Sequence, residues 1–402
     1  MSLAAQCKRT AVRPLAAALI LIALAITVTM PAAAAPFVPA DDNQVLESGL
    51  PTADPRVRQM RALAQALREH RDDLSAAMQL ASRQLAMGVA EADPRFVGYA
   101  RGTLAPWWAD DDASPALRVL RARILQAQHD FVPAAADLRA ALRDMPHAAQ
   151  ALLLLAAIDE VTGDLAEAKD SCARLAGLRP GLAAAACAAS IGSLTGDAER
   201  SYAELRQAIE RDPTADASQR IWALTILGEI AIRRSEPAAE QHLQQALALD
   251  SRDLYALTVY ADYLLDNGRA TEVLRLLRGF ERVDALYLRL ALAAQATGDP
   301  GFARYRDDVA ARFAAARRQG DRLHLRDASR FALEIEHDGP RALDFARQNW
   351  AVHKSPYDAR ALLAAAIACR DLMAGRPAVE WVTATGLEDR TIDRLIERLA
   401  SG

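Results

Sequence analysis

The sequence predicts an all-α solenoid of stacked antiparallel helix pairs, and three observations support this fold class. Small and turn-forming residues recur 34 positions apart, so that Ala134 and Pro146 return as Ala168 and Pro180. Apolar residues follow the i, i+3, i+4 spacing of amphipathic helices, and no long stretch alternates apolar and polar residues as a strand does. A period of about 34 residues indicates helical hairpins, which bury their apolar stripes only by stacking on their neighbours.

Residues 1–34 have the layout of a secretory signal peptide. Three basic residues precede an uncharged apolar run from Leu15 to Met30, and a tract of alanines follows it. This order predicts an exported protein, periplasmic or secreted, that is cut near Ala34 and Ala35. The alternative is an uncleaved anchor, although the run is shorter than the roughly 20 residues that span a bilayer. No other long apolar run lacks charges, so we expect no stable membrane insertion once the signal is removed.

The segments after the signal lead into the repeats. Residues 35–54 are rich in proline and aspartate and are expected to form a flexible leader. Residues 55–113 predict degenerate helical repeats with an irregular loop. Their helices are expected at 56–70, at 72–86 and from Asp93 onward. We expect the helix from Asp93 to lack its second helix, which a loop replaces.

A regular array is predicted over 114–280, and a more degenerate one over 281–402 that ends in a capping helix. Hairpins are expected at 114–145, 148–178, 181–211, 217–249, 252–280, 284–318, 322–353 and 356–385, with the capping helix near 388–400. Pairs such as Gly163-Asp164 mark the turns within hairpins. Glycine accepts the positive φ that ends a first helix, and aspartate caps the second.

The regular part resembles the tetratricopeptide repeat family. The family pattern is a large apolar residue, a Leu-Gly or Leu-Ala pair, a turn glycine, a small residue and a closing proline. It is met by Leu152, Leu155-Ala156, Gly163, Ala168 and Pro180, and in part by Leu227-Gly228 and by Tyr260-Ala261 with Gly268. The resemblance implies a right-handed superhelix of antiparallel helix pairs that binds proteins or peptides on its concave face. It implies neither an activity nor the identity of a ligand.

Charge and motifs argue against several classes of function. The formal net charge is −4 and no block of Lys and Arg occurs, so we expect no nucleic-acid partner. The seven histidines show no H-E-x-x-H spacing, and the chain has neither a Gly-rich phosphate loop nor a G-x-S-x-G motif. We therefore predict no catalytic residue, no metal and no cofactor.

Three cysteines remain after signal removal, and their spacing shows no metal-binding pattern. Cys172 is expected on the second helix of one hairpin and Cys187 on the first helix of the next, so adjacent repeats could bring them together. An oxidising compartment would permit a disulfide between them. The alternative is that these two and Cys369 are small buried thiols.

One pattern predicts a partner-binding surface. The residues of one helix recur 33 positions later in the next hairpin: Trp222, Thr225 and Glu229 return as Tyr255, Thr258 and Asp262. In both sets the spacing places the three side chains on one helical face. By comparison with the family, this face lines the concave groove, where two aromatic rings beside two acids suit a basic or apolar peptide. The alternative is that the rings pack between repeats while the threonines and acids face water.

These observations together predict an exported, non-catalytic interaction scaffold or assembly factor that binds a protein or peptide on the concave face of a solenoid. Two alternatives remain open. One is a helical-repeat module that supports an unrecognised enzymatic activity, carried by residues 93–113 or by the expanded unit 284–318. The other is a structural protein that assembles with copies of itself.

Overall fold

The computed structural model describes residues 54–318 and 324–401. The predicted signal peptide, 1–34, and all but the last residue of the predicted leader, 35–54, lie outside the described residues. Within the described ranges every regular element is a helix, which confirms the all-α prediction. None of these helices is both long enough and apolar enough to cross a membrane.

The described chain divides into two compact units, and the first, which ends at Asp73, contains α1 (Pro55–Glu69). Asp54 caps this helix, because its carboxylate accepts a hydrogen bond of 2.8 Å from the Arg56 N–H. Pro55 takes the first helical position, where a missing N–H costs nothing.

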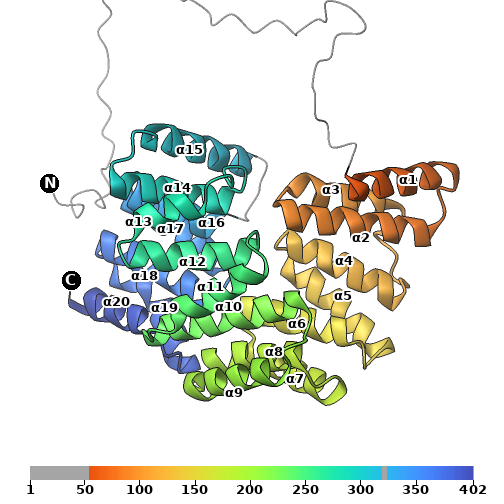
Figure 1. Ribbon diagram of the computed structural model, residues 1–402, viewed down its shortest axis with the longest axis horizontal. Helices are drawn as coiled ribbons and strands as arrows, with labels where there is room; N and C mark the ends of the chain where they lie inside the picture. The colour runs from red at the N-terminus through yellow and green to blue at the C-terminus, as the bar shows by residue number, and fades with distance from the viewer. Residues whose placement is uncertain (1–53, 319–323, 402) are drawn as a thin grey trace, which may run out of the picture. The chain divides into compact units, whose positions relative to one another are not determined.

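The described part of the second unit begins at Leu74 and contains all the other helices (Figure 1). In chain order they are α2 (Leu74–Glu91), α3 (Pro94–Thr103), the 3-10 helix η2 (Ala105–Trp107), α4 (Pro115–Ala127), α5 (Phe131–Asp144), α6 (Ala149–Thr162), α7 (Leu165–Leu178), α8 (Leu182–Leu194), α9 (Ala198–Arg211), α10 (Ala217–Arg234), α11 (Ala239–Leu249), α12 (Leu254–Asp266), α13 (Ala270–Leu276), α14 (Asp284–Thr297), α15 (Phe302–Arg318), α16 (Leu325–Glu334), α17 (Gly339–Trp350), α18 (Pro356–Cys369), α19 (Leu372–Thr385) and α20 (Arg390–Ser401). From α4 onward, these bounds lie within a few residues of the predicted hairpins.

Consecutive helices from α4 onward pack as pairs, and the first helix of each pair also packs on the first helix of the next. This arrangement is the predicted solenoid. Ala134 of α5 and Ala168 of α7 are fully buried in one apolar cluster, together with Leu138 and Leu152. Small side chains at these positions let the helices approach closely, so each pair shares its core with its neighbours.

The N-terminal end of the second unit differs from the prediction. The sequence predicts a helix from Asp93 that lacks its second helix, whereas in the structure α3 pairs with α2. The helix α2 runs on to Glu91, past its predicted end at residue 86. Gly88 allows the close pairing, because a Cβ at this position would lie 3.1 Å from Cγ2 of Val97.

The turns within pairs share one backbone conformation, with or without glycine. Gly163, between α6 and α7, has the predicted positive φ, at 91°. His129, between α4 and α5, and Ser235, between α10 and α11, both adopt a φ of 57°. Positive φ is uncommon for residues other than glycine. The stacking of the pairs therefore imposes the turn even where the sequence lacks its marker.

A disulfide joins two neighbouring pairs. Cys172 of α7 is bonded to Cys187 of α8, with their Cα atoms 5.6 Å apart, and both residues are buried. The positions on the second helix of one pair and the first helix of the next are those that the sequence predicts. Of the two alternatives for these cysteines, the structure shows the disulfide.

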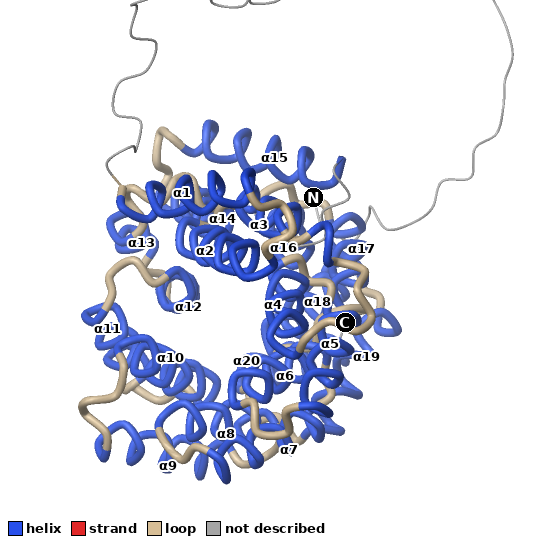
Figure 2. The backbone as a smooth tube through the Cα atoms, turned by 90° about the vertical axis from the view of Figure 1, so that its right-hand side faces the viewer, coloured by secondary structure: helices blue, strands red, loops and turns tan. Residues whose placement is uncertain are grey.

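The pairs of the second unit curve round a common axis (Figure 2), and the loops before α18 and after α19 contact the turns of the pairs from α4/α5 to α10/α11. The loop between α17 and α18 makes the first contacts. The Lys354 N–H donates a backbone hydrogen bond of 2.7 Å to the carbonyl of Val161, near the end of α6. Beside it, Nε2 of His353 lies 3.0 Å from Nδ1 of His129.

Two further contacts continue along the same line. The backbone of Gly386, after α19, comes so close to Gly196 that an added Cβ would lie 3.7 Å from the Gly196 Cα. Nη1 of Arg234 lies 3.5 Å from a carboxylate oxygen of Glu388. We call this set of contacts the seam: the turns at His129, Gly163, Gly196 and Arg234 against the loops at 353–354 and 386–388.

We predict that Ala168→Asp lowers the free energy of unfolding by about 2–4 kcal/mol, because the larger side chain overpacks the crossing and buries a charge without a partner. Ala166→Asp is the matched control, since Ala166 is exposed on the same helix. Thermal or denaturant melts measure both variants. Equal melts for Ala168→Asp and wild type would show that this residue does not lie at a tight crossing.

Candidate partner-binding site

Four side chains from four different pairs lie close together. We call them the inner-face cluster: Glu160 of α6, Glu229 of α10, Tyr255 of α12 and Tyr357 of α18. The Tyr255 hydroxyl donates a hydrogen bond of 2.8 Å to Glu229, and Tyr357 also lies near Glu229. The Ser190 hydroxyl donates to Glu160 at 2.7 Å. The cluster exists because the seam brings α18 opposite α6 and α10.

The two carboxylates of the cluster are held by hydroxyl groups rather than by cations. No ion pair joins Glu160 or Glu229 to a basic side chain among the residues that the structure describes. Burial raises the pKa of Glu160 to about 7, and the negative charge of Glu229 adds to the shift. Burial likewise raises the pKa of Glu229, against the pull of Arg233. A ligand that brings a positive charge could therefore form an ion pair with either acid.

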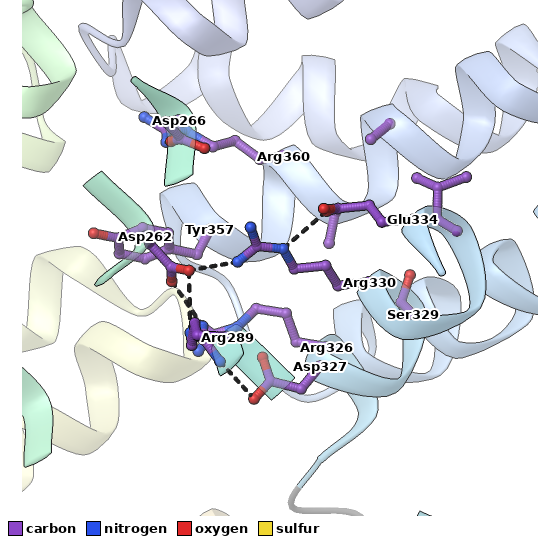
Figure 3. A pocket seen from close by; sticks show the side chains of 13 residues that line it. Asp262, Asp266, Arg289, Arg326, Asp327, Ser329, Arg330, Glu334, Tyr357 and Arg360 are labelled. Carbon is purple, nitrogen blue, oxygen red and sulfur yellow. Dashed lines mark hydrogen bonds and ion pairs between the residues drawn. The ribbon is translucent and has the colours of Figure 1, made fainter. Parts of the chain in front are cut away.

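A pocket of about 150 Å³ adjoins the cluster between α12, α14, α16 and α18 (Figure 3). Its base is a buried ion network centred on Arg289, whose side chain is 2% exposed. The Arg289 guanidinium binds both carboxylate oxygens of Asp262, at 3.0 and 2.7 Å, and one of Asp327, at 3.0 Å. Arg330 reaches Asp262 from the other side. Burial alone would raise the pKa of Asp262, but Arg289 and Arg330 hold it well below its ordinary value.

Some side chains of the pocket wall are not fully paired by the ion network. One carboxylate oxygen of Asp327 is buried without a hydrogen-bond partner. The Arg326 side chain is 39% exposed, and its ion pair with Asp358 is long, at 3.6 Å. Tyr357 lies between the guanidinium groups of Arg326 and Arg360, each 5.6 Å from its ring centroid. The wall therefore offers a guanidinium and an aromatic ring to a polar ligand.

The structure separates the six predicted site residues into two groups. Glu229, Tyr255 and Asp262 take part in the two neighbouring features described above. Thr225 and Thr258 instead donate to carbonyls one turn earlier in their own helices, at 2.9 and 2.7 Å. Trp222 is half-buried and packs against the apolar clusters of two neighbouring pairs.

The repeat pattern does not identify three residues of the site. Arg289 interrupts the apolar stretch of α14, and a lone charge in such a stretch is a sign of a buried ion pair. Glu160 follows Asp159 after the apolar part of α6, and nothing in the sequence distinguishes it from its neighbour. Tyr357 meets Glu229 only because the chain closes on itself, and no spacing within a repeat reveals a contact of that kind.

Comparisons with known proteins do not identify the chain. No protein-family model and no curated protein matches the sequence. Among solved structures, a tetratricopeptide repeat protein from Parabacteroides merdae has 15% identity over 71% of this chain and 98% of its own, with a TM-score of 0.34. The chain is similar to tetratricopeptide repeat structures.

Two eukaryotic structures match as well. Yeast Tom70 has 12% identity over 86% of this chain and 84% of its own, with a TM-score of 0.40. The human IFIT1 dimer with m7Gppp-AAAA also has 12% identity and a TM-score of 0.40, over 86% of each chain.

We predict that Glu160→Gln removes a pH-dependent loss of stability. The folded pKa of Glu160, about 7, lies above its ordinary value of 4.5, so its contribution is fully present below pH 4.5 and is lost as the pH rises to 7. Because the side chain is partly exposed, we expect the variant to be more stable than wild type by only about 1–3 kcal/mol at pH 8, and equal to it at pH 4.5.

Denaturant melts across this range measure the difference. Glu167→Gln is the control, because Glu167 is exposed on α7. Parallel stability profiles for wild type and Glu160→Gln would contradict the burial of this carboxylate.

Proposed function

We propose that this chain is an exported, non-catalytic scaffold that holds a protein or peptide on the inner face of its solenoid. The observation that carries the proposal is the inner-face cluster, in which two carboxylates and two tyrosines from four pairs converge, with no ion pair between these carboxylates and a basic side chain of the described ranges. Groups that serve stability alone are usually paired when they are buried.

The chemistry of the cluster suits a segment that carries a basic or apolar side chain. A lysine or arginine would supply the missing charge, and the tyrosine rings would cover its aliphatic stem. The six predicted residues, Trp222, Thr225, Glu229, Tyr255, Thr258 and Asp262, keep their place in the proposal in two roles. We propose that Glu229, Tyr255 and Asp262 contact the partner, while the other three position the helices that carry them.

Export is part of the same proposal. The basic, apolar and small-residue order of residues 1–34 supports it, and so does the disulfide between Cys172 and Cys187, because disulfides persist mainly in oxidising compartments. We infer a periplasmic or secreted location for the mature chain.

We predict that Tyr255→Ala weakens binding of the partner by more than about 2 kcal/mol and leaves most of the melting temperature intact, because the Tyr255 side chain is 51% exposed and makes one hydrogen bond to Glu229. Trp222→Ala should instead cost up to about 3 kcal/mol of fold stability, since this ring packs between pairs.

The assay is a quantitative pull-down from periplasmic extract, followed by titration of the recovered partner. Tyr99→Ala is the matched control, because Tyr99 of α3 is a tyrosine of similar exposure, 55%, in a different pair. Equal recovery of the partner by wild type and Tyr255→Ala would show that the partner does not bind to the inner face.

We also predict that the mature chain begins near Ala35. Expression of the full sequence in a bacterial host, followed by N-terminal sequencing of the exported fraction, measures this. A chain that keeps Met1 and sediments with the membranes would refute a cleaved signal.

A further inference from the structure

Two imidazole rings form the most unusual contact of the seam. His129 lies in the turn between α4 and α5, and His353 lies 224 positions later, before α18. Their facing nitrogens are 3.0 Å apart, and their ring centroids are 4.9 Å apart. Phe131 stacks on His129 and meets His353 edge-on, so one apolar ring covers both. The seam thus contains a partly buried pair of bases in direct contact.

A hydrogen bond between two imidazole nitrogens needs one of them without a proton. The contact can survive the first protonation, because an imidazolium donates to a neutral ring. It cannot survive the second, which leaves two donors and two positive charges face to face. Acid therefore acts on this contact directly.

The surroundings of the pair favour the neutral rings. The charged and titratable groups that face it from α16, α18 and the loop before α18 are His324, Arg326, Lys354 and Asp358. Only the last of these is an acid, and it already accepts hydrogen bonds from Asn349 and from the Ser355 hydroxyl. Further positive charge on the two rings would find little compensation.

We propose that His129 and His353 form an acid-sensitive clasp, which closes the solenoid when both rings are neutral and opens the seam when both are protonated. Opening separates α18 from α6 and α10, and it takes Tyr357 away from Glu229. The clasp thereby sets access to the inner face. The opening of the clasp can be tested on this chain alone. That it controls partner binding rests on the proposed function.

The direction and range of the pH dependence follow from the two rings. Burial lowers the pKa of His129 from 6.5 to about 4, and the charge of His353 adds to the shift; burial also lowers the pKa of His353. The open form binds these protons more tightly than the closed form. The contribution of these two rings to the closed form is therefore fully present above pH 6.5 and is lost as the pH falls from 6.5 to about 4. Each linked proton changes the ratio of closed to open chains by about tenfold per pH unit.

The backbone hydrogen bond from Lys354 to Val161 crosses the seam and reports on it directly. The experiment follows amide hydrogen exchange of Lys354 in the mature chain from about pH 7.5 to about pH 4.5, with each rate divided by the intrinsic rate at that pH. We expect protection at Lys354 to fall by about tenfold or more between pH 6.5 and 5. The Ala168 amide, bonded to the carbonyl of Asp164 at the start of α7, should stay protected, and helix content by circular dichroism should not change.

The double variant His129→Asn/His353→Gln assigns the protons to the clasp. It keeps neutral polar side chains, and asparagine tolerates the positive φ of residue 129. We expect Lys354 to stay protected in this variant at pH 5. His147→Gln is the matched control and should behave as wild type, because His147 is exposed. Gly163→Ala supplies the open reference, since its Cβ would lie 2.9 Å from Cγ of Lys354.

Three results would overturn the clasp. The first is protection at Lys354 that does not change with pH in the wild type. The second is an equal loss in the wild type and the double variant. The third is a seam already open at pH 7.5 in the double variant and in both single variants, which would make the rings structural contacts only. If acid opens the seam but the partner binds the Tyr255→Ala variant as tightly as wild type, the clasp is supported and the proposed binding face is refuted.

Discussion

The close backbone approach at the seam determines what the inner face of this protein is. One hydrogen bond, from the Lys354 N–H to the Val161 carbonyl, joins segments that are far apart in the chain, and Gly163 leaves room for it because a Cβ there would clash with Lys354. An open solenoid would present α6 and α10 to solvent. The closed one places Tyr357 of α18 against Glu229 and so creates a cluster that no single repeat contains.

The inner face combines two electrostatic environments. Around Arg289, each charge has a partner of opposite sign, which is what a buried ion network needs to offset its desolvation. At Glu160 and Glu229, hydroxyl groups take the place of cations and the pKa values are raised. The first arrangement joins α12, α14 and α16. In the second, a partner could supply the positive charge that the carboxylates lack. The proposed binding function therefore rests on Glu160 and Glu229.

The local pattern of the sequence predicts the helix pairs and their stacking. It does not predict that the solenoid closes at the seam. The 34-residue period places every hairpin from α4 to α19 within a few residues, because repeat spacing and helix caps are local properties. The period does not predict the pairing of α2 with α3, because the sequence does not indicate which helix Gly88 approaches. Of the site, the helical face that carries Glu229, Tyr255 and Asp262 is readable from the repeat. Tyr357 and the His129–His353 contact are not, because they depend on the cumulative rotation of all the intervening pairs.

Closure of the solenoid is the central claim, and a cross-link across the seam tests it most directly. Arg234 and Glu388 are 154 positions apart in sequence, and their side chains come within 3.5 Å. In a Cys369→Ala background, Arg234→Cys/Glu388→Cys should be joined within one chain by a short bismaleimide at neutral pH, in high yield for the folded protein and in low yield after denaturation. A folded, monomeric protein that gives no more intramolecular product than its denatured form would contradict the closed solenoid.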